Sequence, residues 1–157
     1  VHGMKVRYTH DILGWNSRLD ALQAAVLRIK LKHLNTWVAR RQQLAGQYQD
    51  LLGDLEKQGK ITLPKTRPGN FNVYNQYVVR VANRDGVRKQ LEEKGIPTDI
   101  FYPKTIPVQP AVQFLKVDEN KYPISKKAAE EVLALPIFPE LTDNEQKLVS
   151  AALHEIL

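Results

Sequence analysis

The stretch Asn16-Ser17-Arg18 stands at the start of a predicted helix and combines residue types that bind anions. A helix N-terminus offers unpaired backbone N–H groups and a partial positive charge. The Asn16 amide and the Arg18 guanidinium beside it would complete a site for a phosphate or a carboxylate. The spacing Ser17-x-x-Asp20 also fits a capping box, which satisfies the same N–H groups without any ligand. The cap explains Ser17 and Asp20 but leaves Asn16 and Arg18 without a role.

Two further segments carry side chains suited to ligand contact. Upstream, "RYTHDILG" contributes Tyr8 and His10, so that an aromatic ring, an imidazole, an amide and a guanidinium are clustered in the sequence. Downstream, Tyr102 begins a Pro-rich segment whose prolines favour an ordered but irregular loop. Loops of this kind often line binding sites. A packed structural loop with Tyr102 half buried fits the same pattern equally well.

Several classes of site lack their sequence signatures. The chain has no Cys and its 4 His residues do not show metal-ligand spacing, so we expect no metal site. There is no G-x-S-x-G elbow, no G-x-G-x-x-G and no P-loop. The net charge of +6 comes from basic residues interleaved with acidic ones rather than with aromatic ones. That pattern indicates a solvated surface and disfavours nucleic-acid binding.

The bulk composition bounds the class of protein. At 157 residues and 43% hydrophobic, the chain is long enough to bury a core. We find neither an apolar stretch near 18 residues nor a signal peptide, which predicts a soluble protein with no contact to a membrane. The lack of Cys suits a reducing cytoplasm. Because the sequence begins without Met, we expect it to be a piece of a longer protein.

Two helices are predicted in the first third of the chain. Between residues 19 and 34, apolar side chains recur at helical spacing in two adjacent stripes, which predicts a helix buried over a wide arc. From about residue 35 to 56 the pattern is amphipathic, which predicts a second and more exposed helix.

A change of composition in residues 57–72, where Gly, Pro and Asn collect, marks a boundary. Beyond it the pattern predicts a small α/β unit in which Asp85 caps one helix and a Thr142–Glu145 capping box opens the last one. Its expected elements are, in order, a strand at 74–81, a helix at 85–94, a strand at 98–102, an irregular loop, a helix at 125–132, a strand at 133–138 and a final helix.

The residues "HGMKVRYTHDILGWNSRLDALQAAVLRIKLKHL" resemble the middle segment of the DegT/DnrJ/EryC1/StrS aminotransferases, pyridoxal-phosphate enzymes that aminate keto sugars attached to nucleotides. The pieces "NQYVVRV", "LEEKGIPTDIFYPKTIPVQPA" and "YPISKKAAEEVLALPIFPELT" match in the same order, so the similarity covers the whole chain. The G-x-N-x-R-L core and the later Y-P and L-P-x-x-P-E-L pieces are specific to this family.

The resemblance implies an α/β fold, the C-terminal part of a fold-type I transferase. Residues 1–60 would be the end of the large domain with its long connecting helices, and residues 61–157 the small α/β domain. It also implies a homodimer whose active site is shared between subunits. Asn16 would contact the partner's cofactor phosphate, and Arg18 would bind phosphate or substrate. The positions implied on the nucleotide-sugar side are Tyr8, His10, Tyr102 and Gln109.

Two departures from the family pattern matter. Many relatives have His where this chain has Phe101, and Leu-His-Leu-Gln where it has 106–109 (Ile-Pro-Val-Gln), which predicts a different sugar or keto position. The lysine that anchors the cofactor belongs to a family segment that would precede Val1. No lysine of this chain stands in that motif, so we expect the chain alone to be inactive.

The resemblance therefore predicts transamination of a nucleotide-linked keto-deoxysugar, with glutamate as amino donor, for the biosynthesis of a polysaccharide, lipopolysaccharide or antibiotic. Two alternatives remain. Some members of the family carry the label pleiotropic regulatory protein, which would mean a role without catalysis. The chain could also serve only as a dimerisation lobe.

Overall fold

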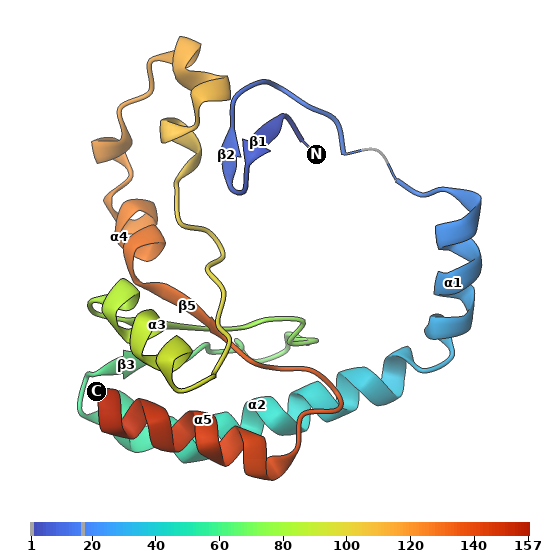
Figure 1. Ribbon diagram of the computed structural model, residues 1–157, viewed down its shortest axis with the longest axis vertical. Helices are drawn as coiled ribbons and strands as arrows, with labels where there is room; N and C mark the ends of the chain where they lie inside the picture. The colour runs from blue at the N-terminus through green and yellow to red at the C-terminus, as the bar shows by residue number, and fades with distance from the viewer. Residues whose placement is uncertain (1, 17) are drawn as a thin grey trace.

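The computed structural model describes residues 2–16 and 18–157. Figure 1 shows a compact lobe built around a small sheet, an N-terminal hairpin that lies beside the 3-10 helices, and a helix of residues 21–31 that is set apart from the lobe. The elements are β1 (Met4–Val6), β2 (Thr9–His10), α1 (Ala21–Leu31), α2 (Leu34–Lys57), β3 (Ile61–Thr62), β4 (Tyr77–Val81), α3 (Arg84–Glu93), the 3-10 helices η1 (Ile106–Val108), η2 (Pro110–Leu115) and η3 (Glu119–Lys121), α4 (Pro123–Glu131), β5 (Val132–Leu135) and α5 (Asp143–Ile156).

The central sheet is antiparallel, with β4 between β3 and β5. The strand expected at 98–102 is reduced to one bridge, in which Asp99 exchanges backbone hydrogen bonds with Ala134 of β5. Pro97 and Pro103 flank it, and a proline cannot donate to a ladder, which limits the pairing to this point. The expected β-α-β unit therefore has β5 inserted between its two outer segments.

The core lies between this sheet and the long helices. Alternate residues of β4, from Tyr77 to Val81, are buried, as expected for a strand with one face on the core. Residues 44, 45, 48, 52 and 55 of α2 are buried at helical spacing, which confirms the amphipathic helix predicted there. The Tyr48 ring packs against Tyr77 with centroids 4.9 Å apart, and its hydroxyl donates to the Pro136 carbonyl at 2.9 Å.

The N-termini of α1 and α3 are capped differently from the predictions. Asp20 itself is the N-cap of α1 and accepts from the Gln23 backbone N–H at 2.8 Å, so the predicted capping box starting at Ser17 is wrong. Ser17 lies outside the described residues. Helix α3 starts after Asn83, and the Asp85 carboxylate accepts from Arg84 instead of capping. The backbone of Asp20 has the extended conformation of an N-cap residue, so its short side chain reaches a free N–H group in the first turn of α1.

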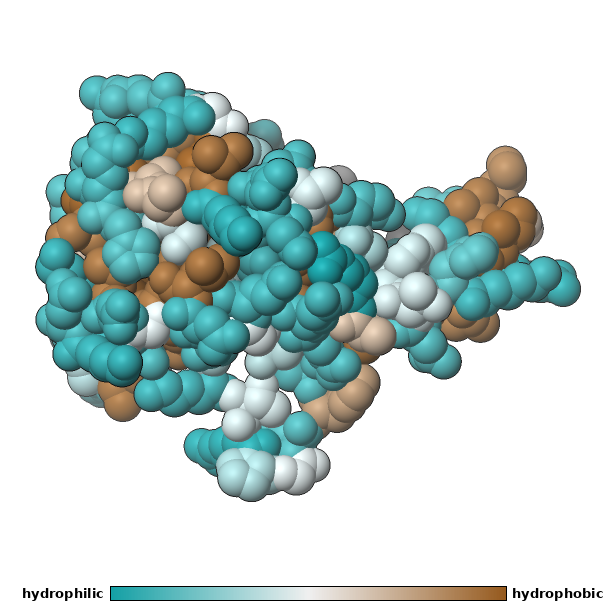
Figure 2. Space-filling view, turned by 90° about the horizontal axis from the view of Figure 1, so that it is seen from below, coloured by the Kyte–Doolittle hydropathy of each residue, from teal (hydrophilic) through white to brown (hydrophobic). Residues whose placement is uncertain are grey.

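Helix α1 is exposed, contrary to the wide buried arc predicted for it. None of its residues is buried, and Leu22 and Ile29 are 81% and 67% exposed. Figure 2 shows apolar side chains gathered on the arm that projects from the lobe. Together with the start of α2 they form a shallow apolar groove, which includes Leu27, Leu31 and Trp37. Periodicity indicated which residues are apolar, but no other element of the described chain covers them.

The capping box of α5 gives a pH-dependent prediction. The Thr142 backbone N–H and hydroxyl donate to the Glu145 carboxylate at 2.8 and 2.7 Å, confirming the predicted box, and these bonds lower the pKa of that carboxyl. Because the folded pKa lies below the unfolded one, the stabilisation is complete above about pH 4.3 and is lost as the pH falls through the folded value.

We therefore expect Glu145→Gln, which can still cap, to flatten the acid side of the stability profile. Urea unfolding between neutral pH and about pH 3 measures this, with the exposed Glu140→Gln as control. Parallel acid profiles for the unmodified protein and Glu145→Gln would contradict the prediction.

Candidate functional site

A two-stranded hairpin carries the first two predicted site residues. Strands β1 and β2 pair antiparallel, and Tyr8 lies in the turn between them with a φ of 63°, in the left-handed region that favours glycine. His10 ends β2. Its Nδ1 lies 2.8 Å from the His2 carbonyl, and since a carbonyl only accepts, Nδ1 is the donor. The Nε2 atom has no hydrogen-bond partner in the described part of the chain and remains available to accept or carry a proton.

The loop from Asp99 to Gln109 lies against this hairpin although it is about ninety residues away in sequence. The Gln109 side chain accepts from the His10 backbone N–H at 3.0 Å and donates to the Tyr8 carbonyl at 3.1 Å. Lys104 Nζ donates to the Thr9 hydroxyl at 3.0 Å. Four of the six predicted site positions, Tyr8, His10, Tyr102 and Gln109, are therefore brought together.

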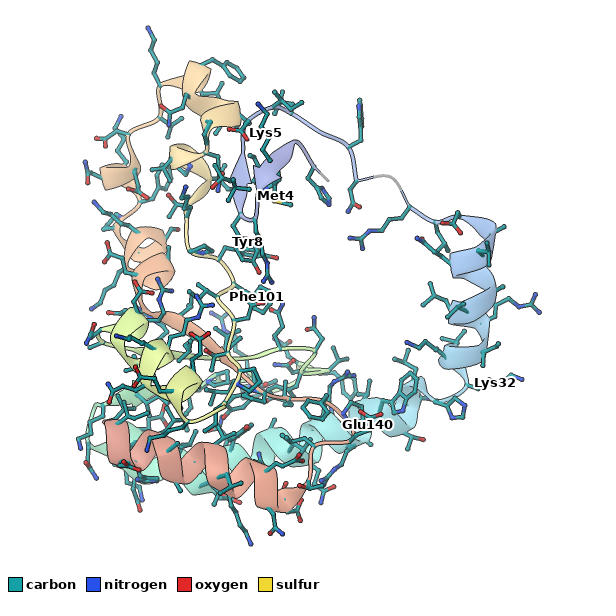
Figure 3. The ribbon with its side chains drawn as sticks, viewed as in Figure 1. Met4, Lys5, Tyr8, Lys32, Phe101 and Glu140 are labelled. Carbon is teal, nitrogen blue, oxygen red and sulfur yellow. The ribbon has the colours of Figure 1, made fainter. Side chains whose placement is uncertain are left out.

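Three aromatic rings meet where the loop contacts the turn. Tyr8 packs edge-on against Tyr102 and Phe101, with centroids 5.6 and 6.3 Å apart, and Figure 3 shows Tyr8 and Phe101 on facing segments. The Arg7 guanidinium lies 4.7 Å from the centre of the Tyr8 ring. Edge-to-face contacts and a cation over a ring face are both favourable. Tyr102 is 62% exposed, so this cluster keeps an open aromatic face.

An ion pair that sequence reasoning missed lies beside these rings. Arg7 donates to the Asp99 carboxylate and, at 2.8 Å, to the Tyr8 hydroxyl. The hydrogen bond to Asp99 raises the pKa of the Arg7 guanidinium above its usual value. Arg7 and Asp99 are 92 positions apart, so no local pattern joins them. The hydroxyl of Tyr8 is thereby held in a fixed polar environment.

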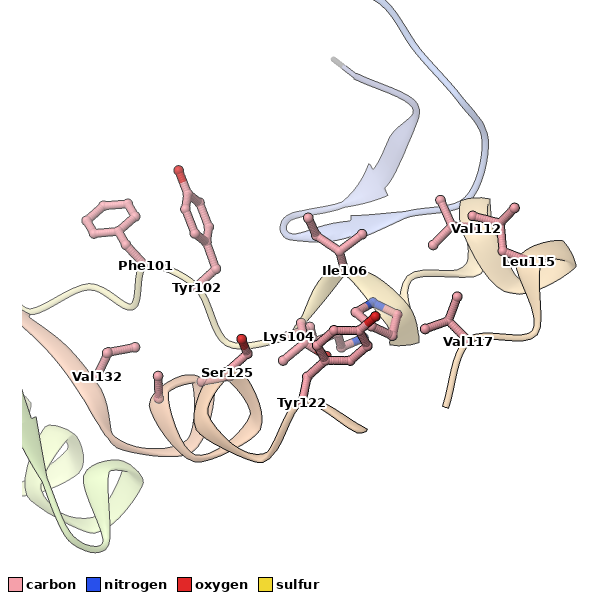
Figure 4. A pocket seen from close by; sticks show the side chains of 14 residues that line it. Phe101, Tyr102, Lys104, Ile106, Val112, Leu115, Val117, Tyr122, Ser125 and Val132 are labelled. Atoms are coloured by element: carbon pink, nitrogen blue, oxygen red, sulfur yellow. The ribbon is translucent and has the colours of Figure 1, made fainter. Parts of the chain in front are cut away.

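A cavity of about 570 Å³ begins at Phe101 and Tyr102 and extends under the 3-10 helices. Figure 4 shows its wall, which is mostly apolar and includes Ile106, Val112 and Tyr122, while Lys104 and Ser125 supply polar atoms. The hydroxyl of the nearly buried Thr105 donates to the Glu119 carboxylate. This bond joins the two ends of the segment that contains η1 and η2. The Pro-rich segment is thus ordered and lines a concave surface.

The predicted anion-binding residues lie elsewhere. Asn16 and Arg18 are exposed on an extended stretch that leads from the hairpin toward α1 (Figure 1). Within the described residues, neither side chain makes a hydrogen bond. They are not brought together with the Tyr8 cluster, and their donors face solvent. Asp20, two residues after Arg18, caps the helix, so the N-terminus of α1 already has one side-chain acceptor.

The backbone at Gly14 lies close to the backbone of His2 and Gly3, at the point where the stretch with Asn16 leaves the hairpin. A Cβ on Gly14 would lie 2.3 Å from the Gly3 nitrogen and 2.4 Å from the His2 carbonyl carbon, so only glycine fits there. The backbone N–H of Asp11 also donates to the Gly3 carbonyl at 3.0 Å. Sequence reasoning noted Gly14 only as part of a motif.

Other kinds of site find little support in residues 2–16 and 18–157. No group of three or more His, Asp and Glu side chains is placed to hold a metal ion there. None of the described helices is both long and apolar enough to span a membrane.

Comparison with known proteins gives consistent matches. The chain is 42% identical over 153 residues to the UDP-2-acetamido-2-deoxy-3-oxo-D-glucuronate aminotransferase of Pseudomonas aeruginosa. It is 41% identical over 153 residues to a protein of Geobacillus stearothermophilus named pleiotropic regulatory protein. These matches cover 97% and 95% of this chain and 40% of each relative. The chain therefore spans about 40% of the length of the curated relatives it matches.

Solved structures give the same result. DesV of S. venezuelae, in complex with a ketimine intermediate, superimposes with a TM-score of 0.82 at 38% identity and covers 98% of this chain and 41% of its own. NtdA of Bacillus subtilis with bound cofactor PMP gives a TM-score of 0.73 at 30% identity, covering 99% and 37%.

These likenesses confirm the expected fold, the C-terminal part of a fold-type I transferase. A sequence model of the family also matches residues 1–154, which is nearly the entire chain. Since both the sequence and the fold agree over this length, the chain belongs to the DegT/DnrJ/EryC1/StrS aminotransferase family.

Proposed function

We propose that the whole protein carrying this chain transfers an amino group from glutamate to a nucleotide-linked keto-deoxysugar, with pyridoxal phosphate as cofactor, in amino-sugar biosynthesis. The name of the Pseudomonas aeruginosa relative supports the substrate class, and the cofactor bound to NtdA supports the cofactor. The observation that carries the proposal is a chain with two separate ligand surfaces. One is formed by the Asn16 amide and the Arg18 guanidinium, and the other is the Tyr8 cluster.

The first surface fits a cofactor phosphate. Asn16 and Arg18 are exposed and make no hydrogen bond to any other described residue, so an amide and a planar guanidinium are available to an anion. Arg binds phosphate with paired N–H donors and a permanent charge. These two residues would hold the phosphate of the cofactor. When bound, pyridoxal phosphate serves as an electron sink that stabilises a carbanion next to the reacting nitrogen.

The second surface suits a sugar with an apolar edge. The open face of Tyr102 and the ring of Tyr8 offer apolar contact, and His10 Nε2 can accept a hydrogen bond from a sugar hydroxyl or hold a proton. Phe101 adds no hydrogen-bonding atom, so at this position the substrate would present a carbon or a deoxy centre. Gln109 was expected to contact the substrate, but its side-chain amide makes two hydrogen bonds to the hairpin.

We further propose a homodimer in which each active site is shared. The stretch with Asn16 and Arg18 leads away from its own aromatic cluster, so the two surfaces would serve different sites, the phosphate contacts reaching into the partner's. Residues 1–60 would end the large domain and 61–157 form the small one, with the second half of α2 packed on the core as the joint.

The catalytic lysine would come from a part of the whole protein outside this chain. No lysine here stands in the anchoring motif of the family, and we expect the 157-residue chain alone to be inactive. We place the protein in the cytoplasm, because a chain without Cys cannot use the disulfides that oxidising compartments favour.

Arg18→Ala in the whole protein tests the first surface. Losing a hydrogen bond to a charged group costs about 1.5–3 kcal/mol, so the Kd for pyridoxal phosphate should rise about ten- to hundredfold. Titrating the cofactor-free protein with pyridoxal phosphate, followed by absorbance, measures this without relying on turnover. Arg67→Ala, which removes an exposed guanidinium from another loop, should leave the Kd unchanged. Equal affinity of Arg18→Ala and the unmodified protein for pyridoxal phosphate would contradict the proposal that Arg18 binds the cofactor phosphate.

A regulatory role without catalysis is the second candidate, favoured by the name of the Geobacillus relative. It requires binding to duplex DNA that weakens steeply with salt and a whole protein that does not take up pyridoxal phosphate. A mobility-shift assay at two salt concentrations, run beside the cofactor titration, separates the candidates.

A further inference from the structure

We infer that Gln109 is a positioning residue that holds the β1–β2 turn, and with it Tyr8 and His10, in place. We call the two hydrogen bonds from the Gln109 side chain to the hairpin the clamp, and they are contacts within this chain. Only the kinetic test of the clamp rests on the proposed function. Gln109 then acts on the substrate indirectly, through the hairpin, and not by direct contact.

The side-chain amide of Gln109 pairs with the backbone of the hairpin as the peptide group of a neighbouring strand would. Its oxygen accepts from the His10 N–H at 3.0 Å and its nitrogen donates to the Tyr8 carbonyl at 3.1 Å. These two backbone groups belong to the turn and to a strand of two residues. A hairpin this short is marginally stable alone, and backbone groups in a folded protein need partners. The side chain thus takes the place of a third strand.

The hairpin uses half of the hydrogen-bonding capacity of the Gln109 amide. A glutamine amide has one oxygen, which can accept two hydrogen bonds, and two N–H donors. The oxygen and one N–H are engaged by the hairpin, and the side chain is half buried between the hairpin and the start of η2. A substrate that used the Gln109 amide fully would have to break one of these bonds.

The Tyr8 ring also packs on Tyr102 and Phe101, but the other polar ties of the hairpin are more exposed than the Gln109 bonds. The Arg7 side chain is 66% exposed in its pair with Asp99, and exposed pairs contribute little. Lys104 makes a single bond to the Thr9 hydroxyl from an exposed position. Tyr8 needs the support, because a left-handed φ in a non-glycine residue costs about 1 kcal/mol or more. Gln109 fixes the carbonyl of that residue.

Hydrogen exchange in the whole protein tests the clamp directly. Gln109→Met keeps the length of the side chain but removes both bonds, and we expect the His10 amide to exchange at least tenfold faster. Gln113→Met is the matched control, since Gln113 lies in η2, is exposed and makes only a 3.4 Å bond to the Pro107 carbonyl. It should leave the hairpin protected. Unchanged exchange in Gln109→Met would overturn the inference.

A kinetic double-mutant cycle tests the action through Tyr8. Residues that act through one another give non-additive effects. We expect Tyr8→Ala to lower kcat/KM for the nucleotide sugar by a smaller factor in the Gln109→Met background than in the unmodified protein. Additive factors, with a raised KM and normal exchange, would make Gln109 a direct ligand instead. If the unmodified protein shows no transamination, the proposed function fails while the exchange measurement still decides the clamp.

Discussion

Gly14→Ala should disrupt the junction between the hairpin and the stretch that carries Asn16. The new methyl carbon would lie 2.3 to 2.9 Å from the Gly3 nitrogen and two His2 backbone carbons, which are backbone atoms that cannot rotate aside. The two chain segments must therefore separate. Overpacking of this kind costs about 1–3 kcal/mol. Because Asn16 is only two residues away, we also expect the Kd for pyridoxal phosphate to rise about tenfold or more, an increase worth about 1.4 kcal/mol.

Gly46→Ala is the matched control for this substitution. Gly46 lies inside α2, where an added Cβ meets nothing within 4 Å, and alanine favours a helix over glycine by about 0.5–1 kcal/mol. It should raise the denaturation midpoint and leave the cofactor Kd unaltered. Hydrogen exchange over residues 2–14, together with the cofactor titration, measures the effect of Gly14→Ala. Normal exchange and normal affinity in Gly14→Ala would show that the close approach is dispensable.

Leu133→Ala should cause the largest loss of global stability, about 2–5 kcal/mol, the range for truncating a fully buried leucine. Leu133 is 0% exposed, lies in β5 and pairs with Val79 at the centre of the sheet. Its neighbour Ala134 holds Asp99 by two backbone hydrogen bonds, so a displaced β5 would also shift the loop with Phe101.

Denaturant unfolding of the whole protein, followed by circular dichroism, measures the change in the free energy of unfolding. Leu148→Ala on α5 removes the same atoms from a side chain that is 66% exposed and should cost far less. Similar losses for both variants would mean that β5 is not at the centre of the core.

Local patterns predicted the elements that have one clear apolar face. Helix α2, strand β4 and the Thr142 capping box were all found close to their expected positions, because helical spacing, alternation and cap chemistry act over a few residues. The start of β4 was predicted three residues too early, since Tyr74, Asn75 and Gln76 lie outside the paired ladder, whereas its end at Val81 agrees.

Features that depend on distant pairs were not predictable in the same way. The contacts of Gln109 with Tyr8 and His10 join residues about a hundred positions apart, and no local spacing encodes them. The requirement for glycine at position 14 arises from a crossing with residue 3 that only the folded backbone creates. The exposure of α1 likewise depends on which surfaces lie near it, whereas periodicity reports only which side chains are apolar.

The uncovered apolar face of α1 also has a thermodynamic consequence. Burying apolar area removes ordered hydration, which gives association a negative change in heat capacity. Leu22, Leu27 and Leu31 are each at least half exposed, so any surface that covers this helix gains affinity mainly from the release of water near room temperature. Assembly through α1 should then weaken on cooling, and its binding enthalpy should become more negative as the temperature rises.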